Sequence, residues 1–103
     1  MNHPRFAMQL MEDLEPDDLR LILSVFQSDV ARLTGVLRLT AKAGDDTGFR
    51  RAAHGLAGAS GAVGADALER ACRAAMARPG MAPADLAAAL GEIEGLAAIA
   101  LAD

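Results

Sequence analysis

The chain has 103 residues, of which 52% are apolar and 3% aromatic, and its formal net charge is −4 at pH 7. This length predicts a single domain that covers residues 1–103, and the apolar content predicts a globular protein rather than a disordered one. Because acidic residues outnumber basic ones, the composition argues against general nucleic-acid binding. The single cysteine, Cys72, excludes an intrachain disulfide and is compatible with a reducing compartment.

Neither a membrane span nor a targeting segment is expected. No apolar stretch reaches the roughly 18 residues that a transmembrane helix needs. Pro4, Glu12 and Asp13 interrupt the first part of the chain in a way that is not typical of a signal peptide, so the cytoplasm is the expected location. The two histidines and the one cysteine lie far apart in the sequence, so no metal site is predicted.

The alanine-rich composition, with almost no β-branched runs, favours helices throughout, and the sequence predicts five of them. A short helix starts near Pro4. A long helix follows Glu15 and ends at Gly44, with Pro16 in its first turn. The apolar positions of this long helix recur at helical spacing: Leu19, Ile22, Leu23, Phe26, Val30, Leu33 and Leu37.

Three further helices follow, and turn-forming residues separate them. The third begins at the Gly44-Asp45-Asp46 break, where one of the aspartates caps it, and it runs to about Val63. The fourth has Asp66 as its predicted cap and ends at Pro79-Gly80, and the last opens at Pro83. The apolar positions of these last two helices are Leu68, Cys72 and Met76, and then Leu86, Leu90, Ile93 and Leu96 or Ala97.

The short connections force neighbouring helices to run antiparallel. The expected fold is therefore all-α, an up-down antiparallel four-helix bundle with a short extra N-terminal helix. Counting from the turns at Gly44 and Gly64, we expect His54 of the third helix to lie level with residues 32–36 of the second. On the fourth helix the corresponding level is that of Ala75 and Met76.

His54 stands in a run of small residues, Ala52-Ala53-His54-Gly55-Leu56-Ala57-Gly58-Ala59-Ser60. At roughly 100° per residue, one side of this helix carries Thr47, Arg50, Arg51, His54, Ala57, Gly58 and Gly61. The opposite side carries Phe49, Ala52, Leu56, Ala59 and Val63. His54 is therefore predicted to be an exposed imidazole whose small neighbours let another protein approach closely. This arrangement favours a histidine that accepts and donates a phosphoryl group.

The residues after His54 follow the order Leu56, Gly58, Ala59, Ser60, Gly64-Ala65, Leu68 and Cys72. This order resembles the motif of histidine-containing phosphotransfer (HPt) domains, His-x-Leu-Lys-Gly-[Ser/Ala]-[Ser/Ala] followed by Gly-Ala, then by Leu and a small residue or Cys. Upstream, Phe26 with Asp29 and Asp46 with Phe49 also resemble the family layout. The resemblance covers nearly the whole chain.

The resemblance implies a four-helix bundle that relays phosphate between receiver domains of response regulators and of a hybrid histidine kinase. It implies that His54 is the phosphoryl-accepting nucleophile and that the chain has no kinase activity of its own. The receiver supplies the aspartyl phosphate and the Mg²⁺, so no cofactor is expected on this chain. This division of roles between the receiver and the chain suits phosphoryl transfer, which depends on positioning the reacting groups and on neutralising their charge. We expect a monomer that binds receivers transiently and binds neither nucleic acid nor membranes.

One position departs from the family pattern, because Ala57 stands where the family usually has lysine, three residues after the histidine. Arg50 lies about 40° to one side of His54 and Arg51 about 60° to the other, and either could reach a phosphate there. We prefer Arg50. The predicted phosphate-proximal or partner-binding residues are thus Arg50, Arg51, Ala57, Gly58 and Gly61.

Two other classes of function stay open. A degenerate bundle of the same ancestry would bind and inhibit a receiver or a histidine kinase without phosphotransfer, and the missing lysine favours it. The phosphotransfer part of a histidine kinase is disfavoured, because the chain has no glycine-rich nucleotide loop with lysine. For Arg50 and Arg51 an ordinary solvated face is the alternative, and Ser60 is expected to bond a backbone carbonyl near the core.

Overall fold

The structure, a computed structural model, describes residues 15–102. Four α-helices follow one another in this range: α2 (Pro16–Ala43), α3 (Asp46–Ala62), α4 (Asp66–Met76) and α5 (Pro83–Leu101). No strand occurs between residues 15 and 102, so the predicted all-α class is confirmed. The short helix that we expect near Pro4 lies outside the described residues.

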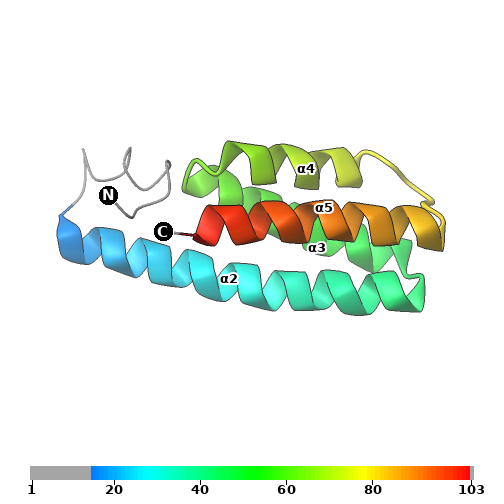
Figure 1. Ribbon diagram of the computed structural model, residues 1–103, viewed down its shortest axis with the longest axis horizontal. Coiled ribbons are helices and arrows are strands. Elements are labelled where there is room, and N and C mark those ends of the chain that lie inside the picture. Colours follow the sequence, from blue (N-terminus) through cyan, green and yellow to red (C-terminus); the bar gives the residue numbers. More distant parts are fainter. Residues whose placement is uncertain (1–14, 103) are drawn as a thin grey trace.

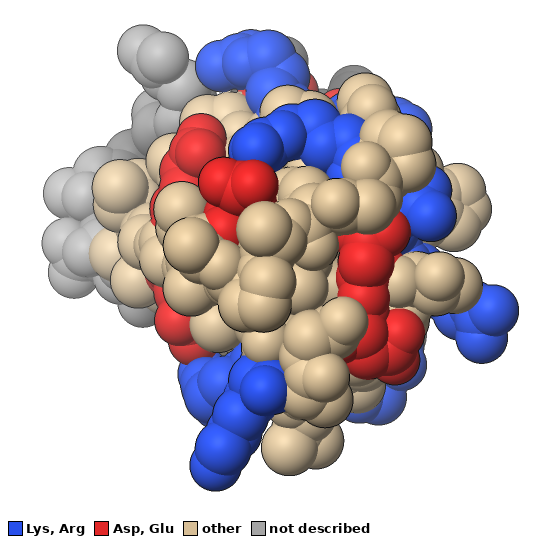
Figure 2. Space-filling model, turned by 90° about the vertical axis from the view of Figure 1, so that its right-hand side faces the viewer, with Lys and Arg blue, Asp and Glu red and all other residues tan. Residues whose placement is uncertain are grey.

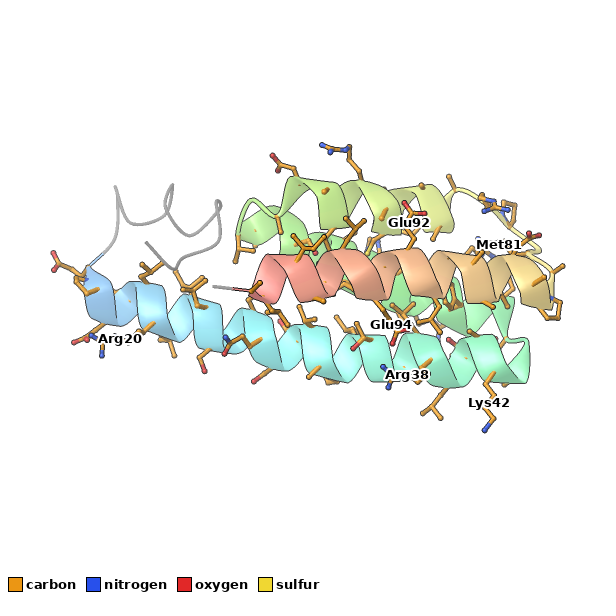
Figure 3. The ribbon with its side chains drawn as sticks, viewed as in Figure 1. Arg20, Arg38, Lys42, Met81, Glu92 and Glu94 are labelled. Atoms are coloured by element: carbon orange, nitrogen blue, oxygen red, sulfur yellow. The ribbon has the colours of Figure 1, made fainter. Side chains whose placement is uncertain are left out.

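The four helices pack into one bundle around a shared core. α3 lies between α2 and α4, and α5 closes the bundle by packing against α2 and α4. Figure 1 shows that the chain turns back at each of the three connections. Arg38 of α2 and Glu94 of α5, which Figure 3 labels, form an ion pair across the α2–α5 contact, with Arg38 Nε 3.2 Å from Glu94 Oε2.

Local chemistry sets the ends of α2 and the start of α3. Pro16 occupies the first turn of α2, where its missing N–H costs nothing. Gly44 ends the helix in the left-handed conformation, with φ 67°, which a glycine adopts without strain. The side chain of Asp45 then accepts a hydrogen bond from the backbone N–H of Gly48 at 2.9 Å, so the prediction of an aspartate cap is confirmed.

The start of α4 differs from the prediction. The cap position belongs to Ala65, and Asp66 is already the first helical residue, so the assignment of Asp66 as the cap is wrong. The reason is the turn before it: Gly64 has φ 74°, and the N–H of Ala65 donates to the carbonyl of Ser60 at 2.9 Å. This turn brings Asp66 into the first turn of α4, where its charge faces the positive end of the helix dipole.

The core is built from the apolar stripes that the sequence predicts. Its members on the helices include Phe26, Val30, Leu33 and Leu37 of α2, Phe49 and Leu56 of α3, Leu68 and Cys72 of α4, and Leu86 and Ile93 of α5. Ile22, Leu23, Leu90 and Leu96 are only half-buried. Burial raises the pKa of the Cys72 thiol to about 11, so this thiol is a protonated packing group at neutral pH.

Candidate functional site

The exposed strip of α3 carries His54 at its middle. The exposed residues of this helix are Thr47, Arg51, His54, Gly55, Gly58, Gly61 and Ala62. The opposite side of the helix is packed into the core, with Phe49 and Leu56 completely buried. Beneath the strip, the hydroxyl of Ser60 donates to the carbonyl of Leu56 at 2.7 Å, as the sequence predicts. The fold therefore presents the His54 side chain to solvent on a helix that is anchored along its other side.

Two glycines mark where the neighbouring helices border this strip. A Cβ atom added to Gly55 would lie 3.3 Å from Cδ2 of Leu33, so α2 borders one side. A Cβ atom added to Gly61 would lie 2.9 Å from the carboxylate of Glu69, so α4 borders the other. The contact between Gly55 and Leu33 agrees with the predicted level of His54 beside residues 32–36.

Gly58 provides open space one helical turn after His54. A Cβ atom added there would meet no atom within 4 Å, and the residue is exposed. Packing within the chain therefore does not require a glycine at this position. A glycine in the middle of a helix costs roughly 1 kcal/mol relative to alanine. A partner that approaches the helix closely at this point would explain why the cost is tolerated.

Ala57 does not belong to the exposed strip. Its side chain is completely buried, so the prediction that it shares the accessible side with His54 is wrong. It lies about 60° round the helix from His54, on the side where Gly61 meets Glu69 of α4. Because α3 is packed by two helices, its exposed arc is narrower than the sequence pattern predicts, and Ala57 falls outside it.

Arg50 is held by an acidic residue one turn before it. Its Nε lies 3.2 Å from Oδ2 of Asp46, and the Arg50 side chain is 32% exposed. Asp46 in turn accepts backbone hydrogen bonds from Gly80 at 2.8 Å and Met81 at 3.2 Å. The Gly80 hydrogen bond, followed by those of Met81 and Arg50, holds the pKa of Asp46 below its ordinary value of 3.8. Arg50 therefore has an acidic partner on its own helix and is only partly exposed.

Arg51 lies on the α2 side of His54 and is exposed. The part of the chain from residue 15 to 102 contains no ion pair to Arg51. The two arginines that flank His54 thus differ. Arg50 is paired with Asp46, and Arg51 is exposed without an acidic partner in this range. Both lie on the first half of α3, with one on each side of the His54 position.

The sequence model of the Hpt domain family matches residues 21–100, which include all of α3 and α4 and most of α2 and α5. The chain belongs to the Hpt domain family. Comparisons with curated proteins and with solved structures gave no match. Hpt domains interact with receiver domains in two-component phosphorelays, and the family match supports a role of the phosphotransfer type for this chain.

The structure of this Hpt domain also bears on metal binding and on insertion into a membrane. Within residues 15–102, no group of three or more His, Cys, Asp or Glu side chains is placed to hold a metal ion. No helix in the same range is long and apolar enough to cross a bilayer. Figure 2 shows the end of the molecule with the α2–α3 turn and the α4–α5 connection, where acidic and basic side chains are interspersed with uncharged ones.

Two features of the Hpt site were missed in the sequence. The hydrogen bonds from Gly80 and Met81 to Asp46 join positions 34 and 35 residues apart, and no local pattern indicates them. Glu69, which borders Gly61, forms an ion pair with Arg73 one turn later, and their spacing of four residues is a signal that could have revealed it. Both features are contacts of acidic side chains, Asp46 and Glu69, that lie next to residues of the candidate site.

Proposed function

We propose that this chain is a phosphocarrier that relays a phosphoryl group, through a phosphohistidine at His54, between receiver-domain aspartates in a two-component phosphorelay. The observation that carries the proposal is the exposure of His54 on α3, beside the open position of Gly58. The Hpt family match adds the expectation of a phosphotransfer-type role. We also propose an up-down antiparallel order for the four helices. In this order α3, which carries His54, lies between α2 and α4.

The transfer step requires one nucleophilic nitrogen on this chain. The unprotonated ring nitrogen of His54 attacks the phosphorus of an aspartyl phosphate in line with the acyl phosphate P–O bond. The N–P bond forms as that P–O bond breaks, and the aspartate of the receiver leaves as a carboxylate. The proton on the other ring nitrogen passes to solvent once the ring carries the phosphoryl group. The reverse sequence, with a second receiver, returns the phosphoryl group to an aspartate.

The remaining chemistry is assigned to the partner. Phosphoryl transfer depends on positioning and on neutralising charge, and both are available at a receiver's own aspartate site, where Mg²⁺ is expected. We therefore propose no cofactor and no autonomous kinase activity for this chain. It would act in the cytoplasm as a monomer that binds receivers of response regulators and of a hybrid histidine kinase.

The docking surface would extend from α3 onto α2. The contact between Leu33 and Gly55 shows that this part of α2 lies next to α3. Leu33 itself is buried, but Val36, which follows it on α2, is apolar and 38% exposed. We prefer this side over α4, where Glu69 and Arg73 form an ion pair at the border of the strip. A receiver that covers His54 and Gly58 would then also contact residues 32–36 of α2.

A second candidate is an inhibitory bundle that binds a receiver or a histidine kinase without accepting phosphate. One observation favours it: an alanine, Ala57, occupies the usual position of the lysine, so this position places no positive charge beside His54. The two candidates differ in whether a covalent bond forms. Incubation of the chain with a radiolabelled phosphorylated receiver separates them.

Under the relay proposal, label leaves the receiver and appears on the chain in acid-labile form. It then passes to a second, unphosphorylated receiver. Under the inhibitory alternative, the two proteins associate, but no label appears on the chain. Receivers from the same genome should be tested as a panel, since the sequence does not name the cognate partner. A chain that binds phosphorylated receivers from this panel without taking up label would contradict the proposal.

A further inference from the structure

Most of the large apolar side chains that are exposed between residues 15 and 102 lie on one face of α2. Five such side chains are exposed in this range, and four of them belong to α2: Leu21, Val25, Val36 and Leu39. At roughly 100° per residue, these four fall within an arc of about 60°. Single exposed apolar residues are common on protein surfaces, but four on one arc of one helix are not a scattered set. We call this arc, from Leu21 to Leu39, the outer face of α2.

The bundle leaves the outer face open. α2 packs against α3 and α5, and its buried side chains, among them Val30 and Leu37, are centred about 130° round the helix from the outer face. In Figure 1, α2 forms the lower edge of the bundle, and none of the other labelled helices lies below it. Within residues 15–102 the fold thus leaves an apolar face about 27 Å long without a helix packed on it.

The spacing of residues on the outer face is typical of a seam between two helices. Residues 21, 25, 28, 32, 35 and 39 follow one another in steps of four and three, the repeat by which two helices keep one side in contact. The ends of this seam are apolar, and its middle holds Ser28 and Arg32. Near one end is Gly35, where an added Cβ atom would meet nothing within 4 Å. The seam therefore has room for a side chain of a neighbouring helix at this glycine.

The seam is complementary to itself when a second copy runs antiparallel. With residue 30 at the twofold centre, Leu21 of each copy lies level with Leu39 of the other, and Val25 lies level with Val36 of the other. Arg32 then lies beside Asp29 of the other copy, its partner within one chain at 3.3 Å. In a parallel pairing, Arg32 would instead face Arg32 of the other copy. The charges at the centre therefore favour the antiparallel arrangement.

A receiver does not account for the whole outer face. The contact between Leu33 and Gly55 marks the level of His54 on α2, and Leu21 lies 12 residues, or about 18 Å, from Leu33 along the helix. An interface of standard size covers about 800 Å² of each partner, a patch with a radius of about 16 Å. A receiver centred on His54 thus falls short of Leu21, whereas a second copy covers both ends of the face.

We propose that the outer face of α2 is a self-association surface, through which two copies of the chain pair antiparallel into a dimer. Each dimer buries two contacts between Leu21 and Leu39, one at either end. The dimer is weak, because each copy contributes one helix and the centre of the seam is polar. At concentrations well below its Kd the chain is a monomer, which is the form proposed to meet a receiver.

Sedimentation equilibrium of the full chain over a wide range of concentrations tests the proposal. Wild type should pass from monomer to dimer as the concentration rises. Leu39→Lys should raise the Kd of the dimer at least about tenfold, because each dimer then contains two lysines in an apolar contact. Ile99→Lys, on α5 and outside the outer face, is the matched control, since Ile99 and Leu39 are each 70% exposed. It should keep the wild-type Kd.

Two results of this measurement overturn the proposal. One is a wild-type chain that stays monomeric up to about 1 mM, which would leave the outer face to another partner. The other is an Ile99→Lys variant that weakens the dimer as much as Leu39→Lys does. No phosphoryl transfer enters the measurement, so its outcome is independent of the proposed function.

The antiparallel register is tested through the charges at the centre and through cross-linking. Arg32→Glu should raise the Kd, and the exchange of Arg32→Glu with Asp29→Arg should restore it. On oxidation, a mixture of Leu21→Cys and Leu39→Cys chains should form a disulfide-linked dimer. Neither variant alone should, because identical positions lie about 27 Å apart in the antiparallel pair, and the native Cys72 is buried. Cross-linking of either variant alone, or no restoration by the exchange, overturns the antiparallel dimer.

Discussion

Leu33 of α2 lies directly beside Gly55 of α3, so that a Cβ atom on Gly55 would be only 3.3 Å from the Leu33 side chain. Gly55 is the residue after His54, and this contact therefore fixes which part of α2 stands next to the proposed phosphorylation site. Close packing at this point also keeps α3 from sliding along α2.

This relationship predicts where a receiver binds. On titration with an unlabelled receiver, the amide chemical shifts of Arg51, Gly58 and Val36 should change, because these residues surround His54 on α3 and α2. Leu21, which is 64% exposed, provides an internal comparison on the same helix. Changes confined to the region of Leu21 or Leu96 would contradict the proposed docking site.

Gly58 tests whether the open position serves a partner. Gly58→Leu should slow transfer by about tenfold or more, since the loss of about 1.4 kcal/mol of docking energy corresponds to a factor of ten. The free energy of unfolding should stay equal or rise by about 0.5–1 kcal/mol, because a side chain there meets no atom within 4 Å and glycine is a poor helix former. Gly58→Ala is the control for helix propensity. A variant that loses stability but keeps its transfer rate would show that Gly58 serves packing.

At Ala57, in contrast to Gly58, a larger side chain is expected to lower the stability of the fold. Ala57→Lys introduces the usual family residue at a completely buried position, and the extra methylene groups must be accommodated in a packed interface. Overpacking of this kind lowers the free energy of unfolding by about 1–3 kcal/mol, which thermal or urea unfolding would measure. Ala62→Lys, at an exposed position of the same helix, should be close to neutral. Equal stability of the two variants would be incompatible with the burial of Ala57.

Asp46 predicts a pH dependence of stability. Its pKa is below the ordinary value of 3.8 in the folded protein, chiefly because of the Gly80 N–H, so its contribution is fully present above that value. The contribution is lost as the pH falls through the lowered pKa of the folded state. The difference in Tm between wild type and Asp46→Asn should therefore be constant from about pH 7 to about pH 5 and shrink in more acidic solution. A difference that persists unchanged at about pH 2 would contradict the assignment.

Much of the helical framework could be predicted from the sequence because it follows from local signals. Pro16 and Pro83 begin α2 and α5, Gly44 ends α2, and the spacing of the apolar residues sets the core face of each helix. The boundary at Asp66 was displaced by one residue because the left-handed turn at Gly64 completes the reversal earlier than the cap pattern indicates.

The candidate site could be predicted only in part. The side of α3 that carries His54 follows from helical periodicity. The width of its exposed arc depends on how two other helices pack against it, and this is why the sequence placed Ala57 on the wrong side. The restraint of Arg50 depends on hydrogen bonds from the α4–α5 connection to Asp46, which arise only when the chain has folded.

The most direct measurement is the location of the phosphoryl group after transfer. The chain has two histidines, so His54→Gln and His3→Gln form a matched pair. Each variant is mixed with a radiolabelled phosphorylated receiver, and the acid-labile label on the chain is counted. The account predicts that His54→Gln folds normally, because its side chain is exposed, and takes up no label, whereas His3→Gln takes up as much as wild type. Acid-labile label on His54→Gln would show that His54 is not the phosphoryl acceptor.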